Sequence, residues 1–375
     1  MFSVIILISF LLFTLLLAVY ASIKSASRNE LKLVRLKTTC GEFVPVRLIS
    51  SKTMCQRNSV VAIPIELDEN GIPLVEVFFG GSGSNSTSTS QSVKVALDTA
   101  SCDLVISGSD CNTCGNGNGK YDPKASPSSK EFDECITVTY GTQSDRGCWW
   151  SDDIKLVGKC ITSCSELHSD NRLDAVEFPG VQFVVSKQRM ESPYAENLPK
   201  SDYSVMGLCH SNDSPPPFLK QVLGDKLVFS IFVTDSRKWF IVGAIPQPCT
   251  RVYELESLNH PEFYVVALKD TYVGRSKIHS SPSKLIFDTG SNMLFVPHNM
   301  LEEMRRTGIL GVKDIRLGFA NFDLTIPVST YMSDDTLLIY GYESNDNSMI
   351  LGSLLLYDTI TEYNATERKV KIGSF

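Results

Sequence analysis

The stretch VALDTASCDLVI, residues 95–106, has a near copy in LIFDTGSNMLFV, residues 285–296. Each copy places Asp-Thr-small-Ser directly after one apolar run and shortly before another, with Asp98 and Asp288 at equivalent positions. A carboxylate between two apolar runs is costly to bury unless it is paired or hydrogen-bonded. The repeat therefore predicts that the two carboxylates meet at one shared site.

Further motifs follow the two copies in order. The first copy is followed by YDPKASPSS at 121–129, by the alternating run ITVTYGT at 136–142, and by VMG at 205–207. The second is followed by ILG at 350–352. Short apolar runs recur between turn residues, and no long helical periodicity is present. The pattern predicts an all-β chain made of two related halves.

Taken together, these motifs resemble those of the pepsin-like aspartic proteases (family A1), and the resemblance extends along most of the chain. It implies the bilobal acid protease fold with a cleft between two β-lobes. Residues 60–248 would form the N-terminal lobe with Asp98, and residues 249–375 the C-terminal lobe with Asp288.

The same resemblance implies an aspartic endopeptidase that needs no cofactor or metal. Two carboxylates that share a site cannot both ionise cheaply, as is known for aspartic proteases, so one holds a proton while the other acts as a base. Asp98 and Asp288 would activate one water for attack on a peptide bond of an extended polypeptide, at acidic pH.

Neighbouring residues are expected to support this pair. By resemblance to the family, Thr99 and Thr289 would hydrogen-bond across the junction of the two loops. Ser101 and Ser291 would donate hydrogen bonds to the carboxylates and favour their charged form. Gly290 would let the backbone pass close to a carboxylate.

A flap over the substrate is expected at Tyr140, Gly141 and Thr142, with Tyr140 presenting its ring and hydroxyl. Gln143 stands where the family has a second glycine, so Gly147 is the residue we expect in the turn.

The chain departs from the family pattern in two further places. Ala100 replaces a glycine, which introduces strain if that position needs a positive φ. Residues 104–106 read Leu-Val-Ile and lack the tryptophan that commonly anchors the flap tyrosine. These departures support one rival hypothesis, a catalytically silent homologue that binds a protein or peptide partner in the cleft. A second rival is a disulfide-linked cell-surface β-domain without activity.

The N-terminus indicates export from the cytosol. Residues 2–21 are almost wholly apolar and predict a signal peptide (1–21), with an uncleaved signal-anchor as the alternative. Residues 22–59 carry scattered basic side chains and predict a propeptide that covers an acidic site until acid neutralises it. We expect a protein that is secreted or resides in an endosomal or vacuolar lumen, with membrane contact only if the segment is retained.

Cysteines and sequons agree with that compartment. In an oxidising lumen most of the 11 cysteines should pair, and their odd number leaves one over. A zinc site at Cys111-x-x-Cys114 and Cys160-x3-Cys164 is the alternative. N-glycosylation sequons begin at Asn85, Asn212 and Asn364. The cysteines are Cys40, Cys55, Cys102, Cys111, Cys114, Cys135, Cys148, Cys160, Cys164, Cys209 and Cys249.

Charge argues against one class of partner. The net charge is −7 and no long basic run is present, so we expect no nucleic acid partner. The predicted state is a monomer acting on polypeptide.

Overall fold

The computed structural model describes residues 60–80, 91–115, 117–141, 143–169, 173–191, 202–211, 216–243, 252–333, 336–343, 347–356 and 358–374. The predicted signal peptide and propeptide lie outside these residues, as do Asn85, Thr142 and Asn212. Within the described part of the chain, no helix has the length and apolar character needed to span a membrane.

Strands dominate the described chain, which confirms the all-β prediction. The first half contains β1 (Val60–Pro64), β2 (Glu66–Leu67), β3 (Pro73–Phe79), β4 (Gln91–Asp98), β5 (Leu104–Ser107), β6 (Lys130–Thr139), β7 (Gln143–Ile161), β8 (Asp174–Glu191), β9 (Ser204–Gly207), β10 (Val228–Val233) and β11 (Lys238–Val242).

The second half is built in the same way. It contains β12 (Val252–Glu256), β13 (Val265–Ala267), β14 (Asp270–Val273), β15 (Ser276–Ile278), β16 (Lys284–Phe287), β17 (Leu294–Pro297), β18 (Ile315–Gly318), β19 (Asp323–Ile326), β20 (Met332–Ser333), β21 (Thr336–Leu337), β22 (Ile339–Tyr342), β23 (Ser348–Leu351), β24 (Thr359–Asn364) and β25 (Lys369–Ser374).

Helices are few and short. The α-helices are α2 (Phe218–Leu223), α3 (His298–Arg306) and α4 (Val328–Tyr331), and 3₁₀ turns occupy Pro123–Ala125, Cys164–His168 and Ser353–Leu356. The helix α3 was not predicted, because its nine residues show apolar periodicity over little more than two turns.

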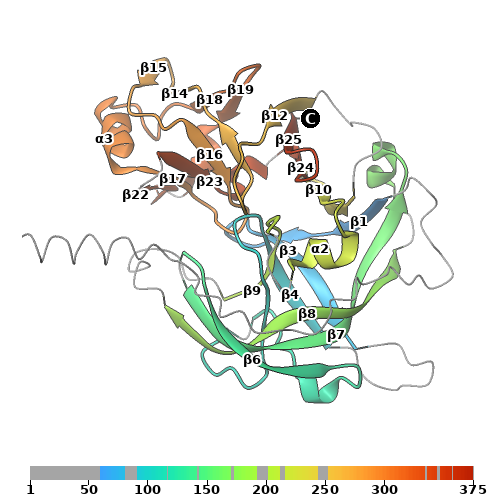
Figure 1. The fold of residues 1–375 in the computed structure, drawn as a ribbon. Coiled ribbons are helices and arrows are strands. Elements are labelled where there is room, and N and C mark those ends of the chain that lie inside the picture. The colour runs from blue at the N-terminus through green and yellow to red at the C-terminus, as the bar shows by residue number, and fades with distance from the viewer. Residues whose placement is uncertain are drawn as a thin grey trace, which may run out of the picture. The chain divides into compact units, whose positions relative to one another are not determined.

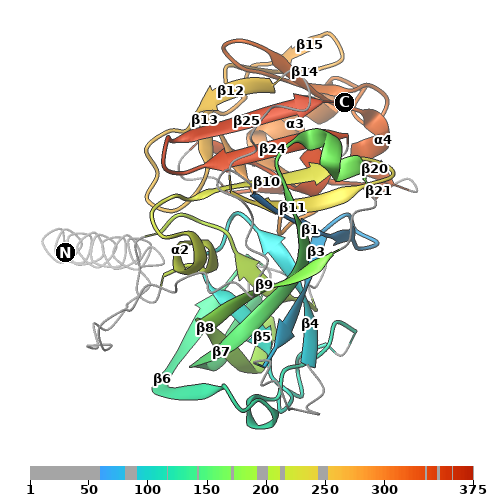
Figure 2. The ribbon, with the colours of Figure 1, turned by 90° about the vertical axis from the view of Figure 1, so that its right-hand side faces the viewer.

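The largest sheet holds the first of the two repeated motifs. Its path is β12-β25-β24-β10-β11-β1-β7-β8-β5-β9-β4-β3-β2, and β6 pairs with β7 beside it. Figures 1 and 2 show β4 next to β9. These two strands run parallel, with Asp98 opposite Gly207, while β5 pairs antiparallel with β9.

A five-stranded sheet, β13-β16-β23-β17-β22, repeats this arrangement around the second motif (Figure 1). Here β16 runs parallel to β23, with Phe287 opposite Leu351, and β17 pairs antiparallel with β23. The three strands β4, β9 and β5 therefore correspond to β16, β23 and β17. The repeat seen in the sequence is a repeat in topology.

Hydrogen bonding continues from the first half of the chain into the last strands. Strand β24 pairs with β10 over six residues, and β25 and β12 extend the sheet beyond it. The predicted lobe boundary at 248/249 lies outside the described residues. The domain limits therefore stay a prediction.

Aromatic side chains form the part of the core that lies behind the second motif. The ring of Tyr363 is stacked on Phe229 at 4.9 Å between centroids and meets the edges of Tyr264 at 5.0 Å and Phe287 at 6.0 Å. All four residues are at most 1% exposed. Burial of such large rings is a major favourable term in folding, and it holds the end of β16 firmly.

The flap hairpin differs from its prediction in one respect. The turn is closed between β6 and β7 by the Tyr140 N–H, which donates to the Gln143 carbonyl at 2.7 Å. Gly147 is not in the turn, so that expectation was wrong. It lies inside β7 opposite Ile136, where a Cβ would come within 2.2 Å of the Val185 carbonyl oxygen. Close approach of β8 requires glycine there.

Candidate active site

Asp98 and Asp288 each follow a strand that ends beside an apolar-apolar-Gly strand. The Leu208 N–H donates to the Asp98 carbonyl at 2.8 Å, and the Asp288 N–H donates to the Leu351 carbonyl at 2.9 Å. A Cβ at Gly207 would lie 2.5 Å from the Cys102 carbonyl carbon.

The second motif depends on glycine in the same way. A Cβ at Gly352 would lie 2.6 Å from the Ser291 carbonyl oxygen. Both motifs therefore need glycine because the loop that carries each aspartate passes directly over that position.

Two threonines join the two aspartate loops. Thr99 Oγ1 donates to the Phe287 carbonyl at 2.8 Å and accepts from the Thr289 N–H at 3.1 Å. Thr289 Oγ1 donates to the Leu97 carbonyl at 2.6 Å and accepts from the Thr99 N–H at 3.2 Å. Both threonines are at most 2% exposed. Four reciprocal bonds thus hold together segments that are 190 residues apart in sequence.

The two carboxyl groups face each other across this junction. Asp98 is 8% exposed and Asp288 is partly buried. Asp98 Oδ1 accepts from the Ala100 N–H at 2.8 Å, and Asp288 Oδ1 accepts from the Gly290 N–H at 3.1 Å. A Cβ at Gly290 would lie 2.5 Å from Cγ of Asp98, so the second loop passes directly beside the carboxylate of the first.

The pKa of Asp288 differs strongly from that of an isolated carboxyl group. Burial, the negative charge of Asp98 and a hydrogen bond shared with Asp98 raise the pKa of Asp288 well above its ordinary value. The hydroxyl of Ser291 and the N–H of Gly290 act in the opposite direction. Two acids close enough to share a hydrogen bond can hold a single proton between them.

Comparisons with known proteins point to one family. Residues 86–308, more than half of the chain, match the family model described as eukaryotic aspartyl protease. This chain belongs to the eukaryotic aspartyl protease family. Membership in it agrees with the repeated topology around the two aspartates and confirms the predicted pepsin-like fold.

Individual relatives of this aspartyl protease family member are distant. Rhizopuspepsin-1 of Rhizopus niveus is 20% identical over 315 residues, which are 75% of either chain. Rhizopuspepsin-2 of the same organism is 24% identical over 227 residues, 57% of this chain and 53% of the relative. Vacuolar protease A of Arthroderma otae is 23% identical over 254 residues, 64% of this chain and 60% of the relative. The last two matches span less than two thirds of the relatives' length.

The two serines of the motifs do not behave alike in this family member. Ser101 Oγ is buried and has no hydrogen-bond partner among the described residues, so the expected bond to Asp98 is not formed. Ser291 Oγ lies 3.4 Å from its own loop's Asp288 carbonyl, and its hydroxyl lowers the pKa of Asp288.

Ala100 is accommodated without backbone strain. It is not among the described non-glycine residues with positive φ, and its N–H donates to the aspartate of its own loop as the N–H of Gly290 does. The condition under which we expected strain at Ala100 is therefore not met.

The absence of the family's tryptophan is compensated in part by a residue from another strand. Val105 is fully buried in a cluster with Val138, Trp149 and Val184, against which Tyr140 packs. The indole of Trp149 thus enters the region near Val105 from β7. This packing could not be predicted, because the two residues are distant along the chain.

Tyr140 ends the flap strand with its hydroxyl buried and without a hydrogen-bond partner among the described residues. Burial raises the pKa of the Tyr140 phenol, and the charges of Asp145, Asp103 and Asp98 raise it further, while Arg189 lowers it. The side chain therefore lies close enough to Asp98 for its charge to contribute to the shift. Gly141 lies in the turn beside it.

A buried ion pair beneath the flap was not predicted. Arg189 Nε donates to Asp145 Oδ1 at 3.0 Å, and the two side chains are 6% and 0% exposed. Ser186 Oγ and Gln143 Nε2 also donate to the Asp145 carboxylate, at 2.7 and 3.2 Å. In the sequence, Asp145 is only a charged residue within a β-strand pattern. Such residues are too common to indicate a buried ion-pair network.

Disulfides agree with the oxidising compartment that the sequence predicted. The described bonds are Cys102–Cys209, Cys111–Cys114 and Cys135–Cys148. The first joins the Asp98 loop to the residues after β9, next to the backbone bond from Leu208 to Asp98. The CxxC pair, considered above as a zinc ligand pair, is a disulfide.

The side chains of the sequon at Asn364 make hydrogen bonds within the folded chain. Asn364 is 5% exposed, and its Oδ1 accepts from the Glu367 N–H at 2.8 Å. The Thr366 hydroxyl donates to the Asp225 carbonyl at 2.9 Å. N-glycosylation would modify Nδ2 rather than Oδ1, so these contacts do not decide it and glycosylation of Asn364 stays a prediction.

Proposed function

We propose that this chain is an aspartic endopeptidase in which Asp98 and Asp288 activate a water molecule for hydrolysis of peptide bonds in extended polypeptides at acidic pH. The observation that carries the proposal is the aspartate pair itself. Two loops locked by reciprocal threonine bonds bring the carboxyl groups within hydrogen-bonding reach, and the pKa of Asp288 is raised by its partner.

The chemistry follows from the single proton that the pair holds. The ionised carboxylate takes a proton from the water, whose oxygen attacks the scissile carbonyl carbon. The protonated carboxyl of the pair donates its proton to the carbonyl oxygen. The resulting gem-diol collapses when the amide nitrogen is protonated and the C–N bond breaks. No covalent intermediate with the protein is required.

Supporting roles belong to residues around the pair. Thr99 and Thr289 keep the carboxyl groups in register, and Gly290 allows their close approach. Tyr140 and Gly141, with Thr142 beyond the described residues, would close over the bound polypeptide and exclude water.

The compartment is part of the proposal. Disulfides in the described chain and the apolar residues 2–21 support passage through the secretory pathway, and one relative is named for the vacuole. Removal of residues 1–21 and of the basic segment to residue 59 would precede activity. N-terminal sequencing of the secreted protein would show a start near residue 60; a mature protein that retains residues 22–59 would contradict the propeptide.

Proteolysis of denatured globin tests the activity. The secreted protein, treated with acid, is expected to cleave globin between about pH 3 and 7 and to be inhibited by pepstatin. Asp98→Asn and Asp288→Asn should abolish cleavage while circular dichroism shows a folded chain. Asp235→Asn, an exposed aspartate in the turn before β11, is the matched control and should leave cleavage intact.

Two results would overturn the proposal. Cleavage that survives either dyad substitution would assign it to another protein in the preparation. A folded, processed protein that cleaves nothing in this range yet binds immobilised pepstatin would be a silent homologue that only binds peptides.

A further inference from the structure

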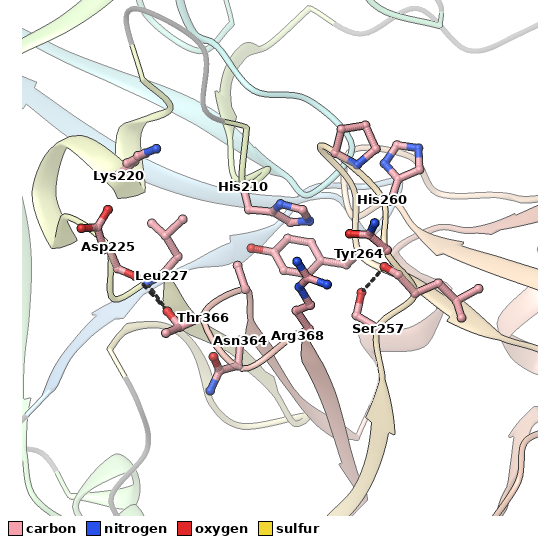
Figure 3. Close-up of a pocket in the computed structure, with 14 residues that line it drawn as sticks. His210, Lys220, Asp225, Leu227, Ser257, His260, Tyr264, Asn364, Thr366 and Arg368 are labelled. Atoms are coloured by element: carbon pink, nitrogen blue, oxygen red, sulfur yellow. Dashed lines mark hydrogen bonds between the residues drawn. The ribbon is translucent and has the colours of Figure 1, made fainter.

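A cavity of about 310 Å³ lies where four segments of the chain meet (Figure 3). The segments are the residues after β9, helix α2 with its following turn, the loop before β13, and the turn between β24 and β25. This volume is at the lower end of the range for small-molecule sites, roughly 300–1,000 Å³. It exceeds what a bare inorganic ion needs.

The lining of this cavity is positive in a chain whose net charge is −7. Lys220 and Arg368 both line it, against the single carboxylate of Asp225, and His210 and His260 add two imidazoles. The guanidinium of Arg368 has no hydrogen-bond or ion-pair partner among the described residues. An unpaired arginine offers a planar set of donors that matches a phosphate or sulfate group.

Hydrogen bonds fix the positions and protons of the imidazoles. His260 Nδ1 accepts from the Glu262 and Phe263 N–H groups at 3.2 and 3.0 Å, so its proton is on Nε2. His210 Nε2 lies 3.2 Å from the Phe263 carbonyl, which only accepts, so Nε2 donates. His210 Nδ1 is left without a partner among the described residues and can accept from a ligand hydroxyl.

The walls of the cavity are rigid. The Thr366 hydroxyl bridges the Asp225 carbonyl and the Leu227 N–H at 2.9 and 3.1 Å, which ties the β24–β25 turn to the end of α2. The Ser257 N–H donates to the Arg368 carbonyl at 2.8 Å. Figure 3 shows His210, His260 and Arg368 around the ring of Tyr264, with Lys220 and Asp225 at the opposite side of the cavity, next to helix α2. A preformed site loses little entropy on binding.

We propose that this cavity binds a phosphate or sulfate ester of about monosaccharide size, with the oxyanion held by Arg368 and a ligand hydroxyl bonded to His210. The site uses neither Asp98 nor Asp288, so it stands whether or not the chain is a protease. Its ligand is identified by chemistry alone: one oxyanion, and a polar body that fills the remaining volume.

Calorimetry at pH 7.5 tests the site with four probes: glucose 6-phosphate, glucose 6-sulfate, glucose and inorganic phosphate. Both esters should bind the mature protein. Each should bind at least about tenfold more tightly than glucose, because a hydrogen bond to a charged group is worth about 1.5–3 kcal/mol, and more tightly than inorganic phosphate, which lacks the hydroxyl that bonds His210. A preference between the two esters would distinguish a phosphorylated from a sulfated ligand.

Arg368→Gln should weaken ester binding at least about tenfold. Lys226→Gln removes the same charge from an exposed residue next to the cavity but outside its lining, and should change the affinity by no more than about twofold. Absence of binding heat at millimolar ester, or equal losses in the two variants, would overturn the site. Inorganic phosphate binding as tightly as the esters would overturn the claim that the ligand is organic.

Discussion

Replacing Thr99 with valine is the sharpest test of how the aspartate pair is held. Valine has nearly the same shape as threonine, so the change removes a hydroxyl and leaves the packing of a fully buried side chain unaltered. Two bonds are lost: the donation to the Phe287 carbonyl at 2.8 Å and the acceptance from the Thr289 N–H at 3.1 Å. Both connect the first aspartate loop to the second.

The expected cost follows from these two bonds. A typical intramolecular hydrogen bond contributes about 0.5–1.5 kcal/mol net, whereas a buried donor left without a partner costs about 1–3 kcal/mol. The Thr289 N–H has no other partner among the described residues, so its burial becomes unfavourable. The free energy of unfolding should fall by about 2–4 kcal/mol. Thr289→Val removes the two other bonds and should cost a similar amount.

Urea unfolding of the mature protein measures this difference, and globin cleavage at acidic pH follows the geometry of the pair. Thr99→Ser is the matched control, since it keeps the hydroxyl and loses only a methyl group, worth about 1 kcal/mol. We expect Thr99→Val to lower kcat and to have a smaller effect on KM, because the carboxyl groups move while the rest of the binding surface does not. If the valine and serine variants unfolded within about 0.5 kcal/mol of each other, the threonine bonds would not be what holds the loops together.

Three further predictions concern the same loops. The raised pKa of Asp288 means that the folded protein keeps this proton after the unfolded chain has lost it, so the free energy of unfolding falls as pH rises above 3.8. Asp288→Asn removes that fall. Urea unfolding should therefore show the stability of the variant rising relative to wild type from about pH 4 to 7. Ala100→Gly should change kcat/KM on globin by less than about threefold, since Ala100 is unstrained; a large gain would show that its methyl group disturbs the pair. Replacing Cys102 and Cys209 together with serine opens a loop of 107 residues and should lower the free energy of unfolding by about 2–5 kcal/mol, with an unchanged urea midpoint as the contrary result.

The repeated motif could be recognised from the sequence because the residues that define each copy are adjacent in the chain. An aspartate followed by threonine and serine between apolar runs appears twice, and each copy folds into the same strand-loop-strand unit beside an apolar-apolar-Gly strand. The all-β class followed from short apolar runs and turn residues. The motifs that end in Gly207 and Gly352 were also recognised in advance, and the structure supplies the reason for the glycines: a loop crosses each strand at about 2.5 Å.

Interactions between distant segments could not be read in this way. The Arg189–Asp145 pair, the packing of Trp149 near Val105 and the grouping of His210, His260 and Arg368 around Tyr264 join residues whose separation in sequence carries no periodic signal. Gly147 was assigned to a turn because glycine is common in turns, whereas β8 approaches its backbone too closely for any side chain.

The sequence by itself determined that two equivalent acids are present. It also determined that each lies between apolar runs, where burial of a single unpaired carboxylate is unfavourable. Only the tertiary structure decided that they face one another, that Thr99 and Thr289 exchange four bonds across the junction, and that burial and Asp98 raise the pKa of Asp288. The reason is physical: local sequence sets backbone conformation and burial, but the pKa of a carboxyl group depends on charges and donors within a few ångströms, and folding brings those from the other half of the chain.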